Sequence, residues 1–512
     1  MGFVKHIERR DMLACTLCHD APCSRACALA CHARGVKEVL PDRRLRNIWF
    51  ENEDTAACAF AEGNPCADCD APCETACVKA GQVRIKELMT RLHDEVLPDT
   101  EIVETGVKGR LAADLCGIPL ENPFLLSSSV VASTYDMCAR AFEAGWAGAA
   151  FKTVCSMDIH EASPRFSAIT GDNGTITGFK NIEQLSDHSV KENMEIFRRL
   201  KAKYPEKFIL ASIMGQNEEE WAELAGLCEE NGADAVELNF SCPNMAESGL
   251  GADIGQTPEF VEQFTAAAKR GCRIPVLAKL TPNVASMCPA GEAARRGGAD
   301  GLAAINTIHS IIGVNPHTYI SAPAVHGMSA VGGYSGNAVK PMALYFIAEL
   351  AQNENLQGMH LSGMGGIETW LDALEFILLG AGSVQVTTAV MQYGYRIIED
   401  LISGMDRYLA EKGVKNIREL TGLGALSVSA STDVLERDTV IYPKFHPAKC
   451  IGCGRCVISC MDGGHQAILF SEDRRPQLDA RKCVGCHLCT LVCPMKAITS
   501  SRKRVKKEKT AV

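Results

Sequence analysis

The middle of the chain, from about residue 103 to residue 412, alternates short apolar runs with amphipathic segments. Eight of the apolar runs predict β-strands, at residues 124–129, 148–154, 207–214, 235–242, 276–282, 301–308, 359–366 and 383–390. The segments between them, such as 218–232 and 368–380, carry apolar residues at helical spacing. Eight strands that alternate with helices in about 290 residues are typical of a TIM barrel. An open doubly wound sheet is the alternative, but it rarely needs eight such units.

Two longer segments interrupt this alternation, at residues 155–188 and 309–339. They follow the second and the sixth predicted strand, at the carboxyl ends where barrel enzymes build their active sites. Loops of that length inside a compact domain usually carry function. We therefore expect both segments to lie beside the site.

Composition and charge exclude several classes of protein. Hydrophobic residues make up 46% of the chain and charged residues 22%, which is a globular composition. The net charge of −10 argues against a nucleic-acid binder, which carries a basic excess. No apolar run reaches the roughly 18 residues of a membrane span and the start lacks a signal-peptide core, so we expect a cytoplasmic protein without a membrane partner. The basic segment 501–512 predicts a solvated, disordered tail; a docking patch for an acidic partner is the alternative.

The 25 cysteines are unevenly distributed, with ten in residues 15–77, seven in 116–288 and eight in 450–493. A secreted disulfide scaffold would be short and evenly cross-linked, so two terminal groups in a long chain indicate metal ligation at both ends. The sequence thus predicts an N-terminal helical iron–sulfur domain at 1–102, the barrel at 103–412, a linker at 413–440, a two-cluster ferredoxin-like domain at 441–500 and a basic tail at 501–512.

The C-terminal group repeats the spacing Cys-x2-Cys-x2-Cys-x3-Cys twice. This is the pattern of bacterial two-cluster ferredoxins, in which the fourth cysteine of each run binds the other cluster. We predict two [4Fe–4S] clusters, one held by Cys450, Cys453, Cys456 and Cys493 and the other by Cys483, Cys486, Cys489 and Cys460. A structural zinc site is the alternative, but zinc does not need four thiolates at this spacing twice.

The N-terminal group has a different spacing. Its two runs are Cys15, Cys18, Cys23 and Cys27, and Cys66, Cys69, Cys73 and Cys77. Two further [4Fe–4S] clusters need eight ligands, and these two runs supply them, although paired cysteines of this kind would also suit zinc. Cys31 and Cys58 are left over, and the spacing alone does not assign each cysteine to a cluster.

A barrel flanked by electron carriers needs a redox centre of its own. The ends of the seventh and eighth strands carry Gly365, Gly366, Thr387 and Thr388. Backbone N–H groups and hydroxyls at that position form the usual phosphate site of a TIM barrel, which would fit the phosphate of FMN. Glycines that only make tight turns are the alternative. The sequence contains no Gly-rich turn with the spacing of a nicotinamide-binding fold.

Other predicted strand ends are polar in a way that a packed core would not tolerate. Lys152, Lys279, Asn239, Asn306 and Thr307 all occupy such ends. A lysine near the pyrimidine edge of a flavin would stabilise the anion that forms on reduction. Asparagine amides offer both a donor and an acceptor to a cyclic imide or amide. Each residue alone is ambiguous, but together at one barrel mouth they predict a site.

The chain closely resembles the dihydropyrimidine dehydrogenase family. The resemblance covers nearly the whole chain and runs through the segments NPFLLSSS, GADAVELNFSCPN, INT, GGYSG, SGMGGI and CIGCGRCVISC. The Cys15–Cys27 run resembles the separate cluster domain of that family, which there precedes an FAD/NADPH module that this sequence lacks. The arrangement is similar to a bacterial FMN subunit with the cluster domain fused in front, and it is related to dihydroorotate dehydrogenases.

Site roles follow from this resemblance at matching positions. Cys242, in NFSCPN, would be the catalytic acid. The pyrimidine would be held by Asn181, Asn239, Asn306 and Thr307, with Asn244 beside them. The flavin would be contacted by Ser127, Ser128, Lys152, Lys279, Gly333, Gly365, Gly366, Thr387 and Thr388.

The implied activity is reduction of the C5–C6 double bond of uracil or thymine, with a hydride from reduced FMN and a proton from Cys242. Electrons would come from an FAD/NAD(P)H flavoprotein subunit, which we favour, or from ferredoxin or flavodoxin, and a homodimer or heterotetramer is expected. Asn244 departs from the pattern, because SCPN is typical of cysteine-type dihydroorotate dehydrogenases, so orotate chemistry is the alternative. A non-catalytic electron-transfer or redox-sensing protein is a third hypothesis, against which the intact strand ends argue.

Overall fold

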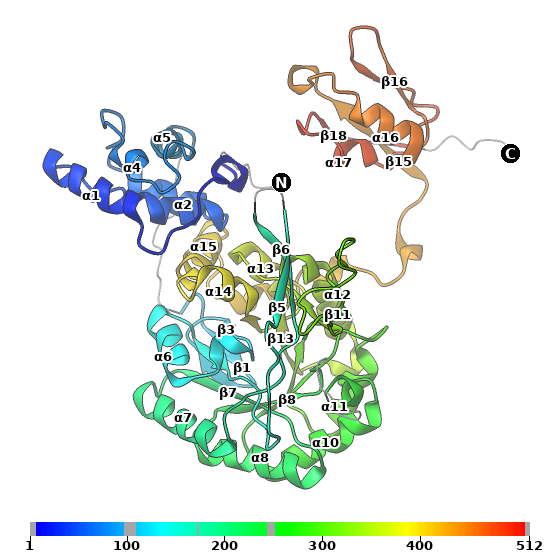
Figure 1. Ribbon diagram of the computed structural model, residues 1–512. Coiled ribbons are helices and arrows are strands. Elements are labelled where there is room, and N and C mark those ends of the chain that lie inside the picture. The colour runs from blue at the N-terminus through cyan, green and yellow to red at the C-terminus, as the bar shows by residue number, and fades with distance from the viewer. Residues whose placement is uncertain (1–6, 97–108, 172–173, 243–250, 507–512) are drawn as a thin grey trace. The chain divides into compact units, whose positions relative to one another are not determined.

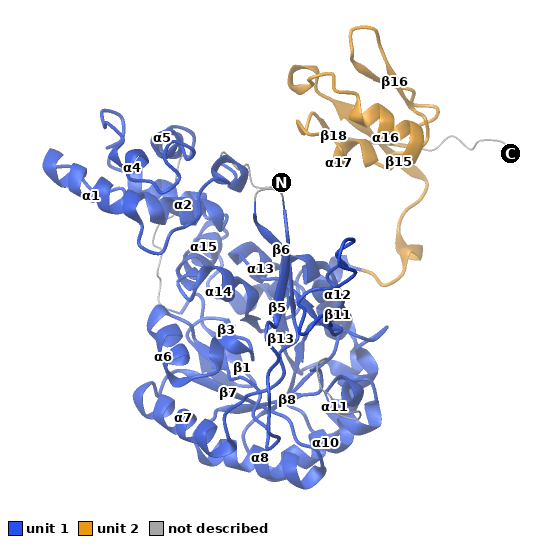
Figure 2. Cartoon of the chain, in the orientation of Figure 1, with its two compact units in different colours: residues 1–428 blue, residues 429–512 orange. Residues whose placement is uncertain are grey.

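A computed structural model describes residues 7–96, 109–171, 174–242 and 251–506. The chain divides into two compact units, Met1–Val428 and Ser429–Val512, which Figure 2 colours separately. The first unit contains the barrel and the N-terminal cysteine group, and the second contains the C-terminal cysteine group.

Eight parallel strands form a closed barrel in the first unit. They are β3 (Phe124–Leu126), β4 (Gly148–Ala150), β7 (Phe208–Ile213), β8 (Ala235–Asn239), β9 (Val276–Lys279), β10 (Gly301–Ala304), β13 (His360–Met364) and β14 (Ser383–Val386). Each strand pairs with its neighbours along the chain, and β14 pairs with β3 to close the ring. Each lies inside one of the eight apolar runs, so the predicted TIM barrel is confirmed.

Helices surround the strands, as Figure 1 shows. They are α6 (Tyr135–Ala144), α7 (Val190–Lys203), α8 (Glu218–Glu230), α10 (Pro258–Gly271), α11 (Cys288–Arg296), α12 (Lys340–Gln352), α13 (Trp370–Leu378) and α15 (Ile397–Glu411). Local sequence sets several of their ends. Ser189 and Glu192 form a capping box at the start of α7, and Thr369 and Asp372 form one at the start of α13, so backbone N–H groups there are satisfied.

A hairpin of β1 (Ala113–Leu115) and β2 (Ile118–Leu120) precedes the barrel. Its Leu115 and Leu120 pack in a small separate core with Leu125, Phe208 and Leu277, which occupy the interior side of barrel strands. Apolar residues therefore fill this end of the barrel, and polar residues gather toward the carboxyl ends of the strands.

The two long insertions pair with each other, which the sequence did not predict. They contribute β5 (Phe166–Thr170), β6 (Ile176–Asn181), β11 (Ile308–Ser310) and β12 (Gly332–Ser335) to an antiparallel sheet in the order β11-β12-β6-β5. Gly178 makes room for the Tyr334 ring, because a Cβ there would lie 1.6 Å from the Tyr334 hydroxyl oxygen. The buried Lys180 ammonium donates hydrogen bonds to the carbonyl oxygens of Ala322 (3.0 Å) and Ala330 (2.8 Å), which fixes the second insertion on β6.

The N-terminal cysteine-rich segment is helical, as predicted. It contains α1 (Pro22–Arg34), α2 (Pro41–Trp49), α3 (Glu53–Ala57), α4 (Pro72–Thr75) and α5 (Ile85–Glu95). The Arg46 guanidinium, on α2, reaches Asp400 on α15 at 2.7 Å, and both side chains are buried. Asn47 donates to the same carboxylate at 2.5 Å. These contacts attach the segment to the barrel within one unit.

The second unit is a small ferredoxin-like domain. It contains β15 (Thr439–Phe445), α16 (Arg455–Gly463), β16 (Ile468–Phe470), β17 (Pro476–Leu478), α17 (Leu488–Leu491) and β18 (Ile498–Lys506). The prediction of a disordered tail is wrong for residues 501–506, because β18 pairs with β15 as far as Lys506 opposite Thr439.

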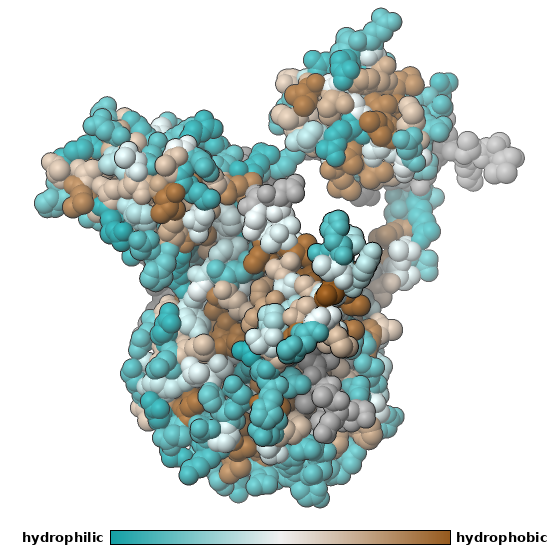
Figure 3. All heavy atoms as spheres, viewed as in Figure 1, coloured by the Kyte–Doolittle hydropathy of each residue, from teal (hydrophilic) through white to brown (hydrophobic). Residues whose placement is uncertain are grey.

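Little apolar material is buried in this second unit. Its core consists of Cys456, Val457, Ile468, Cys489 and Ile498, two of which are cysteines of the predicted cluster sites. Large apolar side chains are instead exposed, among them Ile451, Leu469 and Leu491, and apolar atoms are visible on its surface in Figure 3. A domain with so small a core depends on bound metal for stability.

Candidate functional site

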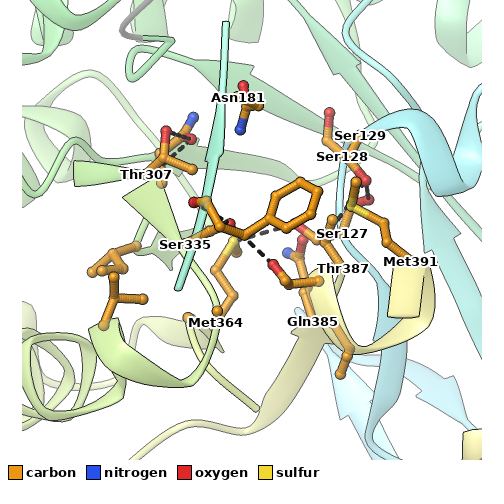
Figure 4. Close-up of a pocket in the computed structure, with 18 of the residues that line it drawn as sticks. Ser127, Ser128, Ser129, Asn181, Thr307, Ser335, Met364, Gln385, Thr387 and Met391 are labelled. Atoms are coloured by element: carbon orange, nitrogen blue, oxygen red, sulfur yellow. Dashed lines mark hydrogen bonds between the residues drawn. The ribbon is translucent and has the colours of Figure 1, made fainter. Parts of the chain in front are cut away.

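One large cavity opens at the carboxyl ends of the barrel strands. Its empty volume is about 1110 Å3, including the part open to solvent. Most residues predicted from the sequence line it: Ser127, Ser128, Lys152, Asn181, Asn239, Cys242, Lys279, Asn306, Thr307, Gly365, Gly366, Thr387 and Thr388. In Figure 4, Thr307 stands on the opposite side of the cavity from Ser128 and Ser129.

Gly333 is not among the described residues that line the cavity. It lies in β12, where it pairs with Asn181 of β6. A Cβ at Gly333 would lie 2.2 Å from the Thr307 hydroxyl oxygen, so Thr307 packs directly against this glycine. Asn244 is outside the described residues.

One end of the cavity is rich in glycine and hydroxyl groups. Gly365 and Gly366 have φ of 121° and 82°, which L-residues rarely adopt. A Cβ on Gly366 would lie 2.9 Å from the Gly336 carbonyl oxygen, so there is no room for a side chain at this position. The Gly366 residue lines the cavity. The Thr387 hydroxyl lies 3.1 Å from the Ser129 hydroxyl, and the Thr388 hydroxyl donates to the Ser335 hydroxyl. Such groups suit a phosphate.

Lys279 is the cation of the barrel interior, with 3% of its surface exposed. Its ammonium lies 3.1 Å from Oε1 of Glu237 and 3.4 Å from the Ser127 hydroxyl oxygen. Glu237 is fully buried on the neighbouring strand β8. The ammonium has three N–H donors, so a donor remains for a ligand beside this ion pair.

Lys152 lies on the other side of the cavity between two carboxylates. Its ammonium is 3.5 Å from Glu161 and 3.6 Å from Glu183, and Arg165 approaches Glu183 at 3.2 Å. Burial raises the pKa of the Glu183 carboxyl, with Lys152 opposing that shift. Both lysines that line the described cavity are therefore already paired with acidic side chains.

Amides and hydroxyls form a continuous network at the ends of β8 and β10. The Asn239 amide donates to the Thr153 hydroxyl at 2.8 Å, and its carbonyl oxygen accepts from the Ser241 hydroxyl at 3.0 Å. The Asn306 amide donates to the Ser241 hydroxyl at 2.8 Å, and its oxygen accepts from Thr307. These bonds fix the rotamers of the asparagines before a ligand binds.

The Cys242 thiol lines the same cavity, close behind β8, and only 7% of the residue is exposed. The backbone N–H of Ala252 donates to its carbonyl oxygen at 3.0 Å, which anchors the chain on both sides of residues 243–250. Cys242 therefore lies at the cavity directly after the fourth barrel strand.

Comparisons with known proteins agree with this geometry. A family model described as dihydroorotate dehydrogenase matches residues 110–409, and one described as a 4Fe-4S dicluster domain matches residues 444–500. The NAD-dependent dihydropyrimidine dehydrogenase subunit PreA of Escherichia coli is 49% identical over 398 residues, which is 78% of this chain and 97% of that protein. The chain belongs to the dihydropyrimidine dehydrogenase family.

A further dihydropyrimidine dehydrogenase and two dihydroorotate dehydrogenases are also similar. The chloroplastic dihydropyrimidine dehydrogenase (NADP(+)) of Arabidopsis thaliana is 36% identical over 64% of this chain and 80% of that protein. The catalytic subunit of dihydroorotate dehydrogenase B of Pyrococcus abyssi is 38% identical over 61% of this chain and 98% of that protein. A dihydroorotate dehydrogenase of Eimeria tenella, solved with ferulenol, shares the fold with a TM-score of 0.51 and 18% identity, over 61% of this chain and 88% of that one.

Family membership makes this chain an oxidoreductase of the dihydropyrimidine and dihydroorotate dehydrogenase class, with flavin and iron–sulfur chemistry. Several lining residues were missed by sequence reasoning, among them Ser129, Thr153, Tyr334 and Gln385. A signal for Gln385 and for the nearby Glu237 was present, because each is a polar residue inside an otherwise apolar strand. Ser129, Thr153 and Tyr334 carried no such signal.

The C-terminal cysteines surround two separate small cavities. One is lined by Cys450, Cys453, Cys456 and Cys493, and the other by Cys460, Cys483, Cys486 and Cys489. Each cavity therefore brings together three cysteines of one run with the fourth of the other. This is the crossed grouping expected from the spacing.

The N-terminal cysteines also cross between their runs. Cys15, Cys18, Cys23 and Cys77 line one small cavity. Around the second group, the Cys27 sulfur lies 3.8 Å from that of Cys31, and Cys27, Cys66 and Cys69 are the cysteines whose charge raises the pKa of Cys73. Burial raises the pKa of Cys15 to about 11 and that of Cys73 to about 12, so a metal that binds these thiols must displace their protons.

Two further observations concern the described residues alone. No three His, Cys, Asp or Glu side chains among them are grouped to hold a single metal ion. In the same part of the chain, no helix combines the length and the apolar character needed to cross a membrane.

Proposed function

We propose that this chain reduces the C5–C6 double bond of uracil or thymine to the 5,6-dihydropyrimidine. The observation that carries the proposal is the character of the cavity around Cys242. Amides and hydroxyls of Asn181, Asn239, Asn306 and Thr307 match the alternating donors and acceptors of a neutral cyclic imide.

FMN is the flavin that we propose for this cavity. The glycine and hydroxyl end, where a Cβ on Gly366 would meet backbone, fits a phosphate. The Lys279 ammonium, buried beside Ser127, fits the pyrimidine edge of a flavin ring. When bound and reduced, FMN supplies the hydride that this reaction requires.

The chain's own residues have three tasks in the proposed reaction. Asn181, Asn239, Asn306 and Thr307 bind the pyrimidine and orient its double bond. The Cys242 thiol donates a proton to C5. The walls of the cavity, including Phe166 and Phe179 from the insertion sheet, exclude water from the reacting atoms.

Dihydroorotate chemistry is the second candidate, and Asn244 in SCPN together with the match to the dihydroorotate dehydrogenase model favours it. Orotate carries a carboxylate that needs a cationic partner. Among the described lining residues, Lys152 is paired with Glu161 and Glu183, and Lys279 with Glu237. A neutral pyrimidine suits such a cavity better than an anionic one.

Four [4Fe–4S] clusters are proposed to carry electrons, two in each cysteine group. Four cysteines around each of three cavities, and a further group around Cys27, support this number. A zinc ion needs sulfurs within about 2.3 Å of one point, and the described cysteines are not grouped for a single ion. Clusters fit these wider groups.

The electron donor is proposed to be an FAD/NAD(P)H flavoprotein subunit, with ferredoxin or flavodoxin as the alternative. The Escherichia coli relative is named as one subunit of an NAD-dependent enzyme, which supports a separate flavoprotein. A homodimer or a heterotetramer is proposed from the resemblance to the dihydropyrimidine dehydrogenase family. A purely electron-transferring or redox-sensing role would not need the intact set of Cys242, Asn239, Asn306 and Thr307 at one cavity.

An anaerobic reoxidation experiment tests the proposed function. Protein reconstituted with flavin and clusters is reduced with dithionite, and flavin absorbance is followed after addition of uracil, thymine or orotate separately. Rapid reoxidation by uracil or thymine, with dihydropyrimidine as product, is expected. Reoxidation by orotate alone would move the assignment to dihydroorotate chemistry, and reoxidation by none would leave only the scaffold in common with the family.

A further inference from the structure

The Gln385 side chain lines the cavity and carries one buried acceptor without a partner among the described residues. Gln385 is on β14, is 1% exposed and lines the cavity near Ser127 and Thr387, as Figure 4 shows. Its amide nitrogen donates to Glu237 Oε2 at 3.0 Å and to the Ser362 hydroxyl at 3.1 Å. Its Oε1 is buried and has no hydrogen-bond partner among the described residues.

The orientation of this amide is fixed by its neighbours. A flipped amide would place Oε1 against the Glu237 carboxylate, where two acceptors would repel each other. Glu237 is itself held in place by the Lys279 ammonium at 3.1 Å. The nitrogen of Gln385 must therefore face Glu237, and Oε1 remains available to accept a hydrogen bond from a ligand.

The identity of that donor follows from the chemistry of the cofactor, so this step rests on the proposed function. The ring system of an oxidised flavin carries a single N–H group, at N3 of its pyrimidine portion. The neighbouring N1 and C2 carbonyl are acceptors, which suit the free donor of the Lys279 ammonium. An acceptor and a cation side by side therefore complement one edge of a flavin and no other.

We propose that Gln385 Oε1 accepts the N3–H of the flavin and thereby positions the ring with its pyrimidine edge against Lys279. Glu237 acts through Gln385 and Lys279 as a positioning residue that orients both. The Ser362 hydroxyl also accepts from Ser383 at 3.0 Å, and Ser383 lies 3.0 Å from the His360 ring, so the amide is anchored on the side away from the cavity as well.

Flavin binding by the cluster-containing protein, stripped of flavin, tests this proposal. The probes are FMN and FMN methylated at N3, titrated by quenching of flavin fluorescence. The wild type should bind FMN at least tenfold more tightly than the N3-methyl analogue. Gln385→Ala removes the acceptor and makes room for the methyl group, so it should bring the two dissociation constants within about threefold of each other.

Two further variants keep the result interpretable. Ser383→Ala alters the same chain of hydrogen bonds without facing the cavity, and it should keep the preference of the wild type. Gln385→Met keeps the volume of the side chain but lacks an acceptor, and it should weaken FMN binding about fivefold to tenfold. Gln385→Met that binds FMN like the wild type, or Gln385→Ala that retains the full preference, would overturn the proposal. A wild type that binds no FMN would instead overturn the flavin assignment of the proposed function.

Discussion

The Cys242 thiol is the group at which a proton leaves the protein in the proposed reaction. Cys242→Ala should lower the rate of pyrimidine-dependent flavin reoxidation about 10²-fold to 10⁴-fold, because a positioned general acid contributes that much. The rate is measured by stopped-flow absorbance, with flavin and cluster absorbance recorded on the same samples. Both absorbances should be retained. Loss of flavin from the variant would show that Cys242 is structural instead.

His360 ends the buried chain of hydrogen bonds that begins at Gln385 and passes through Ser362 and Ser383. It makes the stability of the fold depend on pH. Burial lowers the pKa of His360 to about 4, whereas an unfolded histidine titrates near pH 6.5. The unfolded state therefore takes up the proton first, so the His360 contribution is complete above about pH 6.5 and is lost as the pH falls toward 4. Between pH 7 and pH 5 the first unit should lose about 2 kcal/mol from this residue.

Urea unfolding of the wild type and of His360→Asn at pH 7 and pH 5 measures this contribution. Between pH 7 and pH 5, the free energy of unfolding should fall by about 2 kcal/mol more in the wild type than in His360→Asn. Equal losses in the two proteins would mean that His360 titrates normally in the folded state.

The insertion sheet controls the site through backbone packing. Gly333→Ala would place a Cβ 2.2 Å from the Thr307 hydroxyl oxygen and force Thr307 away from Asn306. Overpacking of this kind costs about 1–3 kcal/mol of stability. We expect a rise in the KM for uracil of at least tenfold with little change in flavin content, measured by flavin reoxidation.

Gly463→Ala is the matched control, because its new Cβ would meet only Leu488, at an ordinary 3.4 Å. Its KM for uracil should equal that of the wild type. An unchanged KM in Gly333→Ala would mean that Thr307 has no part in substrate binding.

The elements differ in how far the sequence could predict them. All eight barrel strands were predicted, since a fully buried strand is a continuous apolar run whose partners are its sequence neighbours. The insertion strands were missed because most of their residues are only partly buried, so they do not form continuous apolar runs. Gly333 and Asn181 pair across about 150 positions of sequence, and no local pattern encodes such a pairing.

The same contrast holds within the site. Lysines, asparagines and glycines at strand ends were predicted because each departs from the apolar pattern around it. The roles of Glu237 and Gln385 depend on which atoms of neighbouring strands meet across the barrel interior, and this follows only from the closed ring. Gly333 was predicted to contact the flavin by resemblance, and its close packing against Thr307 could not be predicted from the sequence.

Across the whole molecule, iron content reports how the cysteines are shared. Four [4Fe–4S] clusters correspond to about 16 iron atoms per chain. Cys493→Ser should lower this to about 12. Adding Cys450→Ser should remove no more, because both residues line one cavity, whereas adding Cys483→Ser should lower it to about 8. Iron analysis of the reconstituted variants makes the measurement.

Cys288→Ser is the control for these variants, because Cys288 lies on α11 of the barrel, outside both cysteine groups, and its iron content should stay at about 16. The opposite pattern, with an additive loss for Cys450 and none for Cys483, would mean that each cluster takes its four ligands from one run.

The crossed grouping of cysteines has a consequence for the life of the protein in the cell. In the proposed C-terminal pair, the two clusters would cross-link the two cysteine runs, since each cluster would tie the run that supplies three ligands to the run that supplies the fourth. A ribosome that has made only the first run has exposed three of the four thiols for one cluster, so neither cluster can be completed before the second run emerges. Both electron carriers of a pair should therefore be installed together during biogenesis.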